Sequence, residues 1–102
     1  MDIYRKITEI DRMVNEPARL AILTALYELK EADFTFLNRI TGLTRGNLSA
    51  HLNKLEEAGY VEIEKTFIGK RPTTIIRITT EGRKALEEYL RTIRKVMEKV
   101  QE

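Results

Sequence analysis

One short stretch, from Thr41 to Val61, leaves few folds open to this chain, because it combines a glycine turn, an amphipathic segment and a second glycine. We expect a helix to begin at Thr44, whose hydroxyl can accept a hydrogen bond from a free backbone N–H of the first turn. The helix should end near Ala58, where Gly59 can adopt the left-handed conformation that closes many helices. The hydrophobic period changes from helical to alternating after Gly59, so a strand should follow.

The predicted helix has two unlike faces. Leu48, Leu52 and Leu55 fall on one stripe at the i, i+4, i+7 spacing of a buried face. A face of small, polar and cationic residues can lie flat in a DNA major groove, although a solvated helix face has a similar composition. The opposite side of this helix consists of Gly46, Ser49, Ala50 and Asn53, with Arg45, Asn47 and Lys54 at its edges.

The segments before this helix favour the DNA-binding interpretation. A helix should follow Pro17, with Ile22, Leu26 and Leu29 on one face and Leu23 beside them. Asp33 is a suitable N-cap for a shorter helix over residues 34–40. Its inward residues would be Phe36, Leu37 and Ile40. A short helix, a turn over residues 41–43 and a polar-faced helix form a helix-turn-helix arrangement.

A β-hairpin, or wing, is predicted behind the helix-turn-helix. Residues 60–67 alternate, residues 68–72 form the tip, and the β-branched run over residues 73–79 returns. No acidic residue occurs between Lys65 and Arg77, and we expect Lys70 and Arg71 at the tip to contact phosphates. The aromatic side chains of Tyr60, Phe67 and Phe36 are predicted to pack in the core rather than stack on bases.

The two terminal segments carry apolar stripes that predict a homodimer. In the first helix the stripe is Ile3, Ile7, Ile10 and Val14. Thr80 should cap a last helix whose stripe is Leu86, Tyr89, Ile93, Val96 and Val100, widened by Leu90 and Met97. A monomer whose terminal helices cover one another is the alternative. The predicted organisation is an N-terminal helix over 1–16, a winged core over 17–80 and a dimerisation helix over 81–102.

Length and composition indicate a single globular domain. With 102 residues, a net charge of +2 and no cysteine, the chain is expected to be a single cytoplasmic domain without disulfides. No apolar run approaches the length of a membrane span. We expect no catalytic residues, metal or cofactor, because the chain lacks a Gly-rich phosphate loop and a cluster of metal ligands. His51, the only histidine, is expected to pack or to contact phosphate.

From Ala18 to Leu86 the chain resembles the winged helix-turn-helix regulators, in particular the small MarR/ArsR-like DNA-binding domains. The residues that carry the resemblance are 20–23, 33–37, 47–61, 69–74 and 78–83. The resemblance implies a mainly α fold with a small β-hairpin and a dimeric transcriptional regulator. It also implies that the wing tip reaches the DNA backbone or minor groove. The cysteine ligands of the metal-sensing ArsR branch are missing, so metal sensing is not expected.

Together these observations predict a homodimer that represses or activates transcription by binding a pseudo-palindromic operator in double-stranded DNA. A protein-interaction module without DNA readout is the alternative, and a small-molecule effector is left open. The predicted DNA-binding residues are Thr44, Arg45, Asn47, Ser49, Ala50, Asn53, Lys54, Lys65, Lys70 and Arg71.

Overall fold

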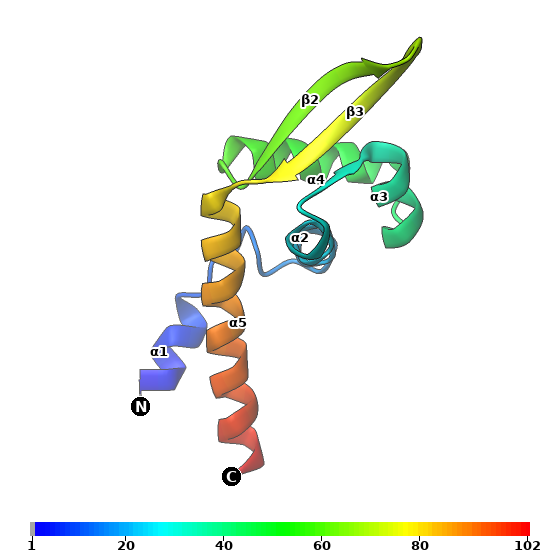
Figure 1. Ribbon diagram of the computed structural model, residues 1–102. Helices are drawn as coiled ribbons and strands as arrows, with labels where there is room; N and C mark the ends of the chain where they lie inside the picture. The colour runs from blue at the N-terminus through cyan, green and yellow to red at the C-terminus, as the bar shows by residue number, and fades with distance from the viewer. Residues whose placement is uncertain (1) are drawn as a thin grey trace.

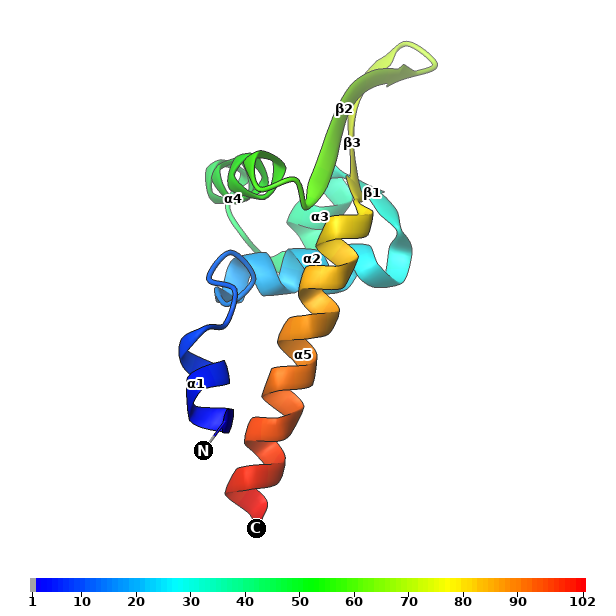
Figure 2. The ribbon, with the colours of Figure 1, turned by 90° about the vertical axis from the view of Figure 1, so that its left-hand side faces the viewer.

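Five helices and three strands make up residues 2–102, the part of the chain that the computed structural model describes (Figure 1). In chain order they are α1 (Asp2–Thr8), α2 (Pro17–Leu29), β1 (Glu31–Asp33), α3 (Phe34–Thr41), α4 (Arg45–Glu57), β2 (Val61–Ile68), β3 (Arg71–Ile78) and α5 (Thr80–Gln101). The wing, formed by β2 and β3, and the C-terminal end of α5 project from opposite ends of the molecule, with α1 beside α5 (Figure 2).

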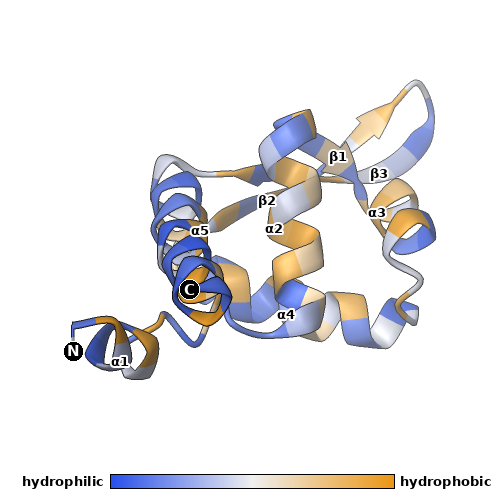
Figure 3. Ribbon diagram, turned by 90° about the horizontal axis from the view of Figure 1, so that it is seen from below, coloured by the Kyte–Doolittle hydropathy of each residue, from blue (hydrophilic) through white to orange (hydrophobic). Residues whose placement is uncertain are grey.

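The core forms around α2, which packs against α3, α4, α5 and the sheet (Figure 3). The leucine stripe predicted for α4 is confirmed, since Leu48, Leu52 and Leu55 are at most 2% exposed. Burial of one such side chain contributes about 1.5–3 kcal/mol. These three leucines therefore determine which face of α4 points inward and which face is left to solvent. The other fully buried side chains include Ile22, Leu23, Leu26, Leu37, Val61 and Ile76.

The predicted start of α3 and both ends of α4 are confirmed by their caps, whereas α3 ends at Thr41, one residue later than predicted. Thr44 Oγ1 accepts a hydrogen bond of 3.1 Å from the backbone N–H of Asn47, and Asp33 Oδ1 accepts one of 2.7 Å from Phe36. Gly59 has a φ of +80°, which is the left-handed conformation expected after α4. Each of these contacts spans only three residues of chain or fewer, which is why the sequence pattern predicted them.

The cap of α5 is one residue earlier than predicted. Thr79, and not Thr80, accepts the hydrogen bond from the backbone N–H of Gly82, at 3.0 Å. The Thr79 hydroxyl also donates to the carbonyl oxygen of Gly59 at 2.6 Å. A single hydroxyl at this position therefore both caps α5 and ties its start to the end of α4.

The sheet has three antiparallel strands in the order β1-β3-β2, whereas the sequence predicted only the hairpin. The additional strand, β1, has three residues and pairs with β3 from Glu31 opposite Arg77 to Asp33 opposite Ile75. A strand this short shows no alternation of its own, and its partner lies far along the chain. The guanidinium of Arg77 bridges Glu31 at 2.9 Å and Glu64 at 2.8 Å, so this cation is already paired across all three strands.

The first helix is shorter than predicted. α1 ends at Thr8, and the chain from residue 9 to residue 16 is a loop in which Val14 is fully buried. Val14 was expected on a dimer surface, but it packs in the core beside α2 and α4. The helical spacing from Ile3 to Val14 is therefore partly coincidental, because its last member is brought to the core by a loop.

Side chains from distant parts of the chain hold this loop in place. Arg19 in α2 donates from Nε to the carbonyl oxygen of Met13 at 2.7 Å and from Nη2 to that of Arg12 at 3.3 Å. The hydroxyl of Tyr60, at the start of the wing, donates to the carboxylate of Asp11. These bonds fasten the loop to the core at two points, which explains why it is not helical.

Three apolar residues predicted to face inward are substantially exposed. In α3 only Leu37 is buried, whereas Phe36 is 38% and Ile40 is 48% exposed. Leu29, at the end of α2, is 41% exposed. Since α3 has only eight residues, only one of its turns faces the core, and Leu37 is the residue that this turn buries. No helix within residues 2–102 has the length and apolar character of a membrane span.

The bond between Tyr60 and Asp11 predicts a pH-dependent contribution to stability. Burial, with the nearby Asp11 carboxylate, raises the pKa of Tyr60 to about 12, above the unfolded value of 10.0. The fold favours the neutral phenol, so the contribution is complete below pH 10.0 and is lost as the pH rises through about 12. We expect the wild-type advantage in unfolding free energy over Tyr60→Phe to be constant between pH 7 and 9.5 and to shrink above pH 10. Urea unfolding of both proteins at each pH measures this difference, and a constant difference up to pH 11.5 would contradict the assignment.

Candidate nucleic-acid interface

The outward face of α4 is open to solvent along its length. Because the leucine stripe points to the core, the residues on the other side face outward. Thr44, Arg45, Gly46, Asn47, Ser49, Ala50, Asn53 and Lys54 are all exposed. Ala50 and Gly46 leave the backbone accessible near the centre of this face, so a flat polar surface can approach it closely. The hydroxyl of Thr44 caps the helix, so the side chain of this predicted contact residue already accepts a hydrogen bond from the backbone.

The wing adds a second cationic surface. Lys65, Lys70 and Arg71 are exposed, and none of them forms an ion pair within residues 2–102. A turn of two residues, Gly69 and Lys70, joins the strands, and Gly69 has a φ of +64°. Glycine adopts this conformation without a steric cost, so the hairpin can close tightly and project its cations from the end.

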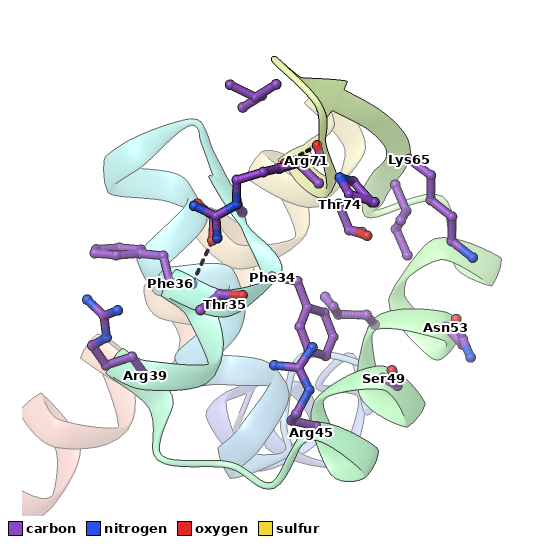
Figure 4. A pocket seen from close by; sticks show the side chains of 16 residues that line it. Phe34, Thr35, Phe36, Arg39, Arg45, Ser49, Asn53, Lys65, Arg71 and Thr74 are labelled. Carbon is purple, nitrogen blue, oxygen red and sulfur yellow. Dashed lines mark hydrogen bonds between the residues drawn. The ribbon is translucent and has the colours of Figure 1, made fainter.

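A groove of about 740 Å³ joins the two surfaces (Figure 4). It brings together five residues predicted from the sequence, namely Arg45, Ser49, Asn53, Lys65 and Arg71. The other predicted residues lie outside it on α4 and at the end of the wing. The groove also includes residues that the sequence interpretation missed: Phe34, Thr35 and Arg39 from α3, and Thr73 and Thr74 from β3. Arg39 and the threonines carry no local signal, because only the folding of α3 against the wing brings them to the groove.

Arg45 is held in place by an aromatic ring. Its guanidinium carbon lies 4.8 Å from the centroid of the Phe34 ring, which is within the range of a cation–π contact (Figure 4). The contact restricts the long side chain of Arg45 at the first turn of α4. An arginine held in this way loses less conformational entropy when it binds a base or a phosphate.

His51 lies on the protected side of α4 and belongs to a polar cluster with α2. Its Nδ1 is 3.2 Å from Nη1 of Arg19, and its Nε2 is 3.6 Å from Oε2 of Glu16. An arginine only donates, so Nδ1 acts as the acceptor and Nε2 carries a hydrogen toward Glu16. The cluster ties the middle of α4 to the start of α2. Within residues 2–102, no three His, Asp or Glu side chains gather as metal ligands would.

The apolar residues of the terminal segments divide into three groups. Val14 and Leu86 are buried in the core, so neither has surface for the dimer contact predicted from the sequence. Ile3, Tyr89, Ile93 and Val96 are half-buried, and α1 packs against α5 of the same chain. Ile10, in the loop after α1, is half-buried as well. Ile7, Leu90, Met97 and Val100 are exposed, and Tyr4, which the sequence interpretation missed, is 55% exposed. We call these five exposed side chains the terminal patch.

Comparisons with known proteins agree with this arrangement. A family model described as a winged helix DNA-binding domain matches residues 18–97. An uncharacterized protein from Methanocaldococcus jannaschii is 44% identical over 79 residues, which cover 78% of this chain and 86% of that protein.

Two solved structures extend the comparison to three dimensions. A transcriptional regulator homologue from Pyrococcus horikoshii OT3 superposes with a TM-score of 0.89 at 30% identity, covering 94% of this chain and 97% of that chain. A MarR family transcriptional regulator from Silicibacter pomeroyi has a TM-score of 0.70 at 17% identity, covering 96% of this chain and 65% of that chain. At 17% identity, the similarity to the Silicibacter pomeroyi protein shows a shared fold only.

Proposed function

The chain belongs to the winged helix DNA-binding domain family, and from this premise we propose that it is a homodimeric regulator that recognises a pseudo-palindromic operator. Its family and fold are those of transcriptional regulators and not of enzymes. The observation that carries the proposal is the exposed, leucine-free face of α4, which is bordered by cations that form no ion pair within residues 2–102. Its proposed location is the cytoplasm, and it requires no cofactor.

In this proposal α4 lies in the major groove. Arg45, Asn47, Ser49 and Asn53 contact base edges, where arginine pairs with guanine and asparagine with adenine. Ala50 allows close approach or contacts a thymine methyl group. The backbone contacts come from cations around this face and from the α3 side of the groove: Lys54, Lys65, Lys70, Arg71 and, in addition to the residues predicted from the sequence, Arg39.

The dimer is proposed to form through α1 and α5. The terminal patch exposes apolar surface along α1 and α5, away from the wing, where a second copy can cover it. A twofold axis there would place two copies of α4 about one DNA turn, ~34 Å, apart. The dimer then binds both half-sites in one event. This doubles the number of DNA contacts that one small domain makes alone and so increases the affinity for a specific operator.

The direct test uses an operator selected from random duplex DNA on the purified protein. Arg45→Ala should cost on the order of 1–3 kcal/mol and relax the preference at one base position in each half-site. Lys70→Ala should weaken binding to all sequences, and it should lower the slope of log K against log salt by about 2 for two subunits. Fluorescence anisotropy titrations at several salt concentrations measure both effects.

The matched control is Lys84→Ala, which removes the same charge from α5, outside α4 and the wing. Equal binding of the wild type, Arg45→Ala and Lys70→Ala would reject the assignment of the interface. A protein-interaction module that does not read DNA would show little retention on random duplex and little dependence on salt, which separates that alternative from the proposal.

A further inference from the structure

The wing tip, residues 67–72, exposes large apolar side chains. Phe67 is 68% exposed and Ile68 is 63% exposed, so the sequence prediction that Phe67 packs in the core is wrong. The physical reason is the length of the hairpin. Val61, at the base of β2, is 2% exposed and Ile63 is half-buried, whereas the residues near the end of the strand lie beyond the core.

Nothing in the rest of residues 2–102 covers this apolar surface. Phe67 stands opposite Pro72 on one face of the hairpin, and Ile68 stands opposite Arg71 on the other face, so each face of the tip carries an exposed apolar side chain. The third strand, β1, pairs with β3 only from Ile75 to Arg77 and leaves the outer half of the hairpin two-stranded. Figure 1 shows the tip standing clear of every helix. Two adjacent apolar residues at such a place suggest a bound partner.

The charges around the tip define the chemistry of that partner. Lys65, Lys70 and Arg71 are exposed within a few residues of Phe67 and Ile68, and no acidic residue occurs from Lys65 to Arg77. The acidic residue that lines the groove is Asp33 of β1, whose Oδ1 already accepts a hydrogen bond from Phe36. A surface that is both apolar and cationic fits a polyanion that also offers apolar surface, which describes the stacked bases of DNA between two phosphate chains. An apolar protein groove would leave the cations unpaired.

The tip is also placed where a bound duplex would reach it. Arg71 lines the same groove as Arg45 and Ser49 of α4 (Figure 4). Its neighbours Ile68 and Pro72 also line this groove, whereas Phe67 does not. The strand from Val61 to Ile68 is about 25 Å long at ~3.3 Å per residue. In the proposed complex the hairpin is therefore long enough for residues 67–72 to reach the minor groove next to the major groove that holds α4.

We propose that the end of the wing inserts into the minor groove beside each half-site and kinks the DNA there, with Phe67 as the apolar wedge on one face of the tip and Ile68 on the other. The inference rests on the proposed operator binding and adds a second source of specificity to it. Pyrimidine–purine steps unstack most easily, so the operator should prefer them at the position of the wedge. Lys70 and Arg71 hold the flanking phosphates while the bases separate.

The test compares the wild type with Phe67→Thr/Ile68→Thr on the selected operator. Threonine keeps the β-propensity of the strand, and both positions are exposed, so the fold should be unchanged. A series of operators is prepared in which 2-aminopurine replaces each adenine that flanks the half-sites, one adenine per duplex. The fluorescence of 2-aminopurine increases when this base unstacks. A gel assay with permuted sites measures the bend of the same complexes.

The wild type should raise the fluorescence at one flanking step and bend the DNA by about 20–90°. The double variant should lose both signals and bind on the order of tenfold more weakly. Its salt slope should be unchanged, since no charge is removed. Phe67→Leu, which retains an apolar wedge, should keep the fluorescence change and most of the bend.

Binding of the double variant with the wild-type affinity, bend and fluorescence would overturn the wedge while leaving the proposed function intact. Association of the wild type with DNA without any unstacked flanking base would do the same. A wild type that binds no duplex would instead remove the proposed function, and the wedge with it.

Discussion

Gly82→Ala is expected to destabilise the fold strongly, although it adds only one methyl group. Gly82 lies buried in the first turn of α5, where a Cβ atom would overlap the carbonyl oxygen of Tyr60 and approach Ile78 Cγ1 to 3.0 Å. The Tyr60 carbonyl cannot move freely, because it accepts a hydrogen bond of 3.0 Å from the backbone N–H of Thr79. A methyl group here must push the start of α5 away from the base of the wing.

Two effects of the substitution oppose each other. Alanine has the higher helix propensity, which favours the variant by up to about 1 kcal/mol. Overpacking against backbone atoms typically costs about 1–3 kcal/mol, and more where the neighbour cannot yield. Since the neighbour is a hydrogen-bonded carbonyl, the cost should prevail, with a net loss of about 2 kcal/mol. That loss is a large part of the ~5–15 kcal/mol that holds a domain folded.

Thermal and urea unfolding at one fixed protein concentration measure the effect, and Tm should fall by roughly 10 °C. Gly46→Ala is the matched control, because Gly46 also lies in a first turn, on α4, and has no atom within 4 Å of the added Cβ. This control should leave the stability unchanged or raise it slightly. A Gly82→Ala protein as stable as the wild type would show that α5 can shift at little cost.

Met97→Glu is expected to separate the subunits and to reduce operator affinity at least about 100-fold. Met97 lies in the terminal patch and is 53% exposed, so the change should leave the fold of each protomer intact. In the proposed dimer it would place a carboxylate from each subunit in an apolar contact, where a charge without a partner is strongly unfavourable. A monomer must bind each half-site separately, and the loss of linkage commonly weakens binding by about 10²–10⁴-fold.

Sedimentation equilibrium would measure the state of assembly, and anisotropy titrations would measure the affinity for the operator. Thr80→Glu is the charge-matched control, since Thr80 is an exposed residue at the other end of α5 and lies outside the terminal patch. This control should remain a dimer with nearly unchanged affinity. The proposed interface is rejected if Met97→Glu stays dimeric and binds as the wild type does, or if the wild type itself binds the operator as a monomer.

Most of the candidate interface could be predicted because its signals are local. The caps at Thr44 and Gly59 and the spacing of the leucines in α4 act over at most a few turns, and all were correct. The predicted contact residues of α4 are exposed for the same reason. The members that were missed, such as Arg39, reach the groove from another helix, and no pattern within that helix distinguishes Arg39 from an ordinary surface cation.

Errors in the prediction occur where distant segments meet. Val14 continues a helical spacing, yet bonds from Arg19 and Tyr60 to neighbouring loop residues draw it into the core. Phe67 fits an alternating strand, yet the strand extends beyond the core that would cover it.

Residue spacing and capping chemistry were thus sufficient to define α4, its two faces and the cationic wing, because each depends on contacts within one turn or one hairpin. The shape of the interface required the packed molecule. Which cations remain unpaired, how Arg45 is held over Phe34 and which apolar residues stay uncovered all depend on the positions of elements far apart in the chain.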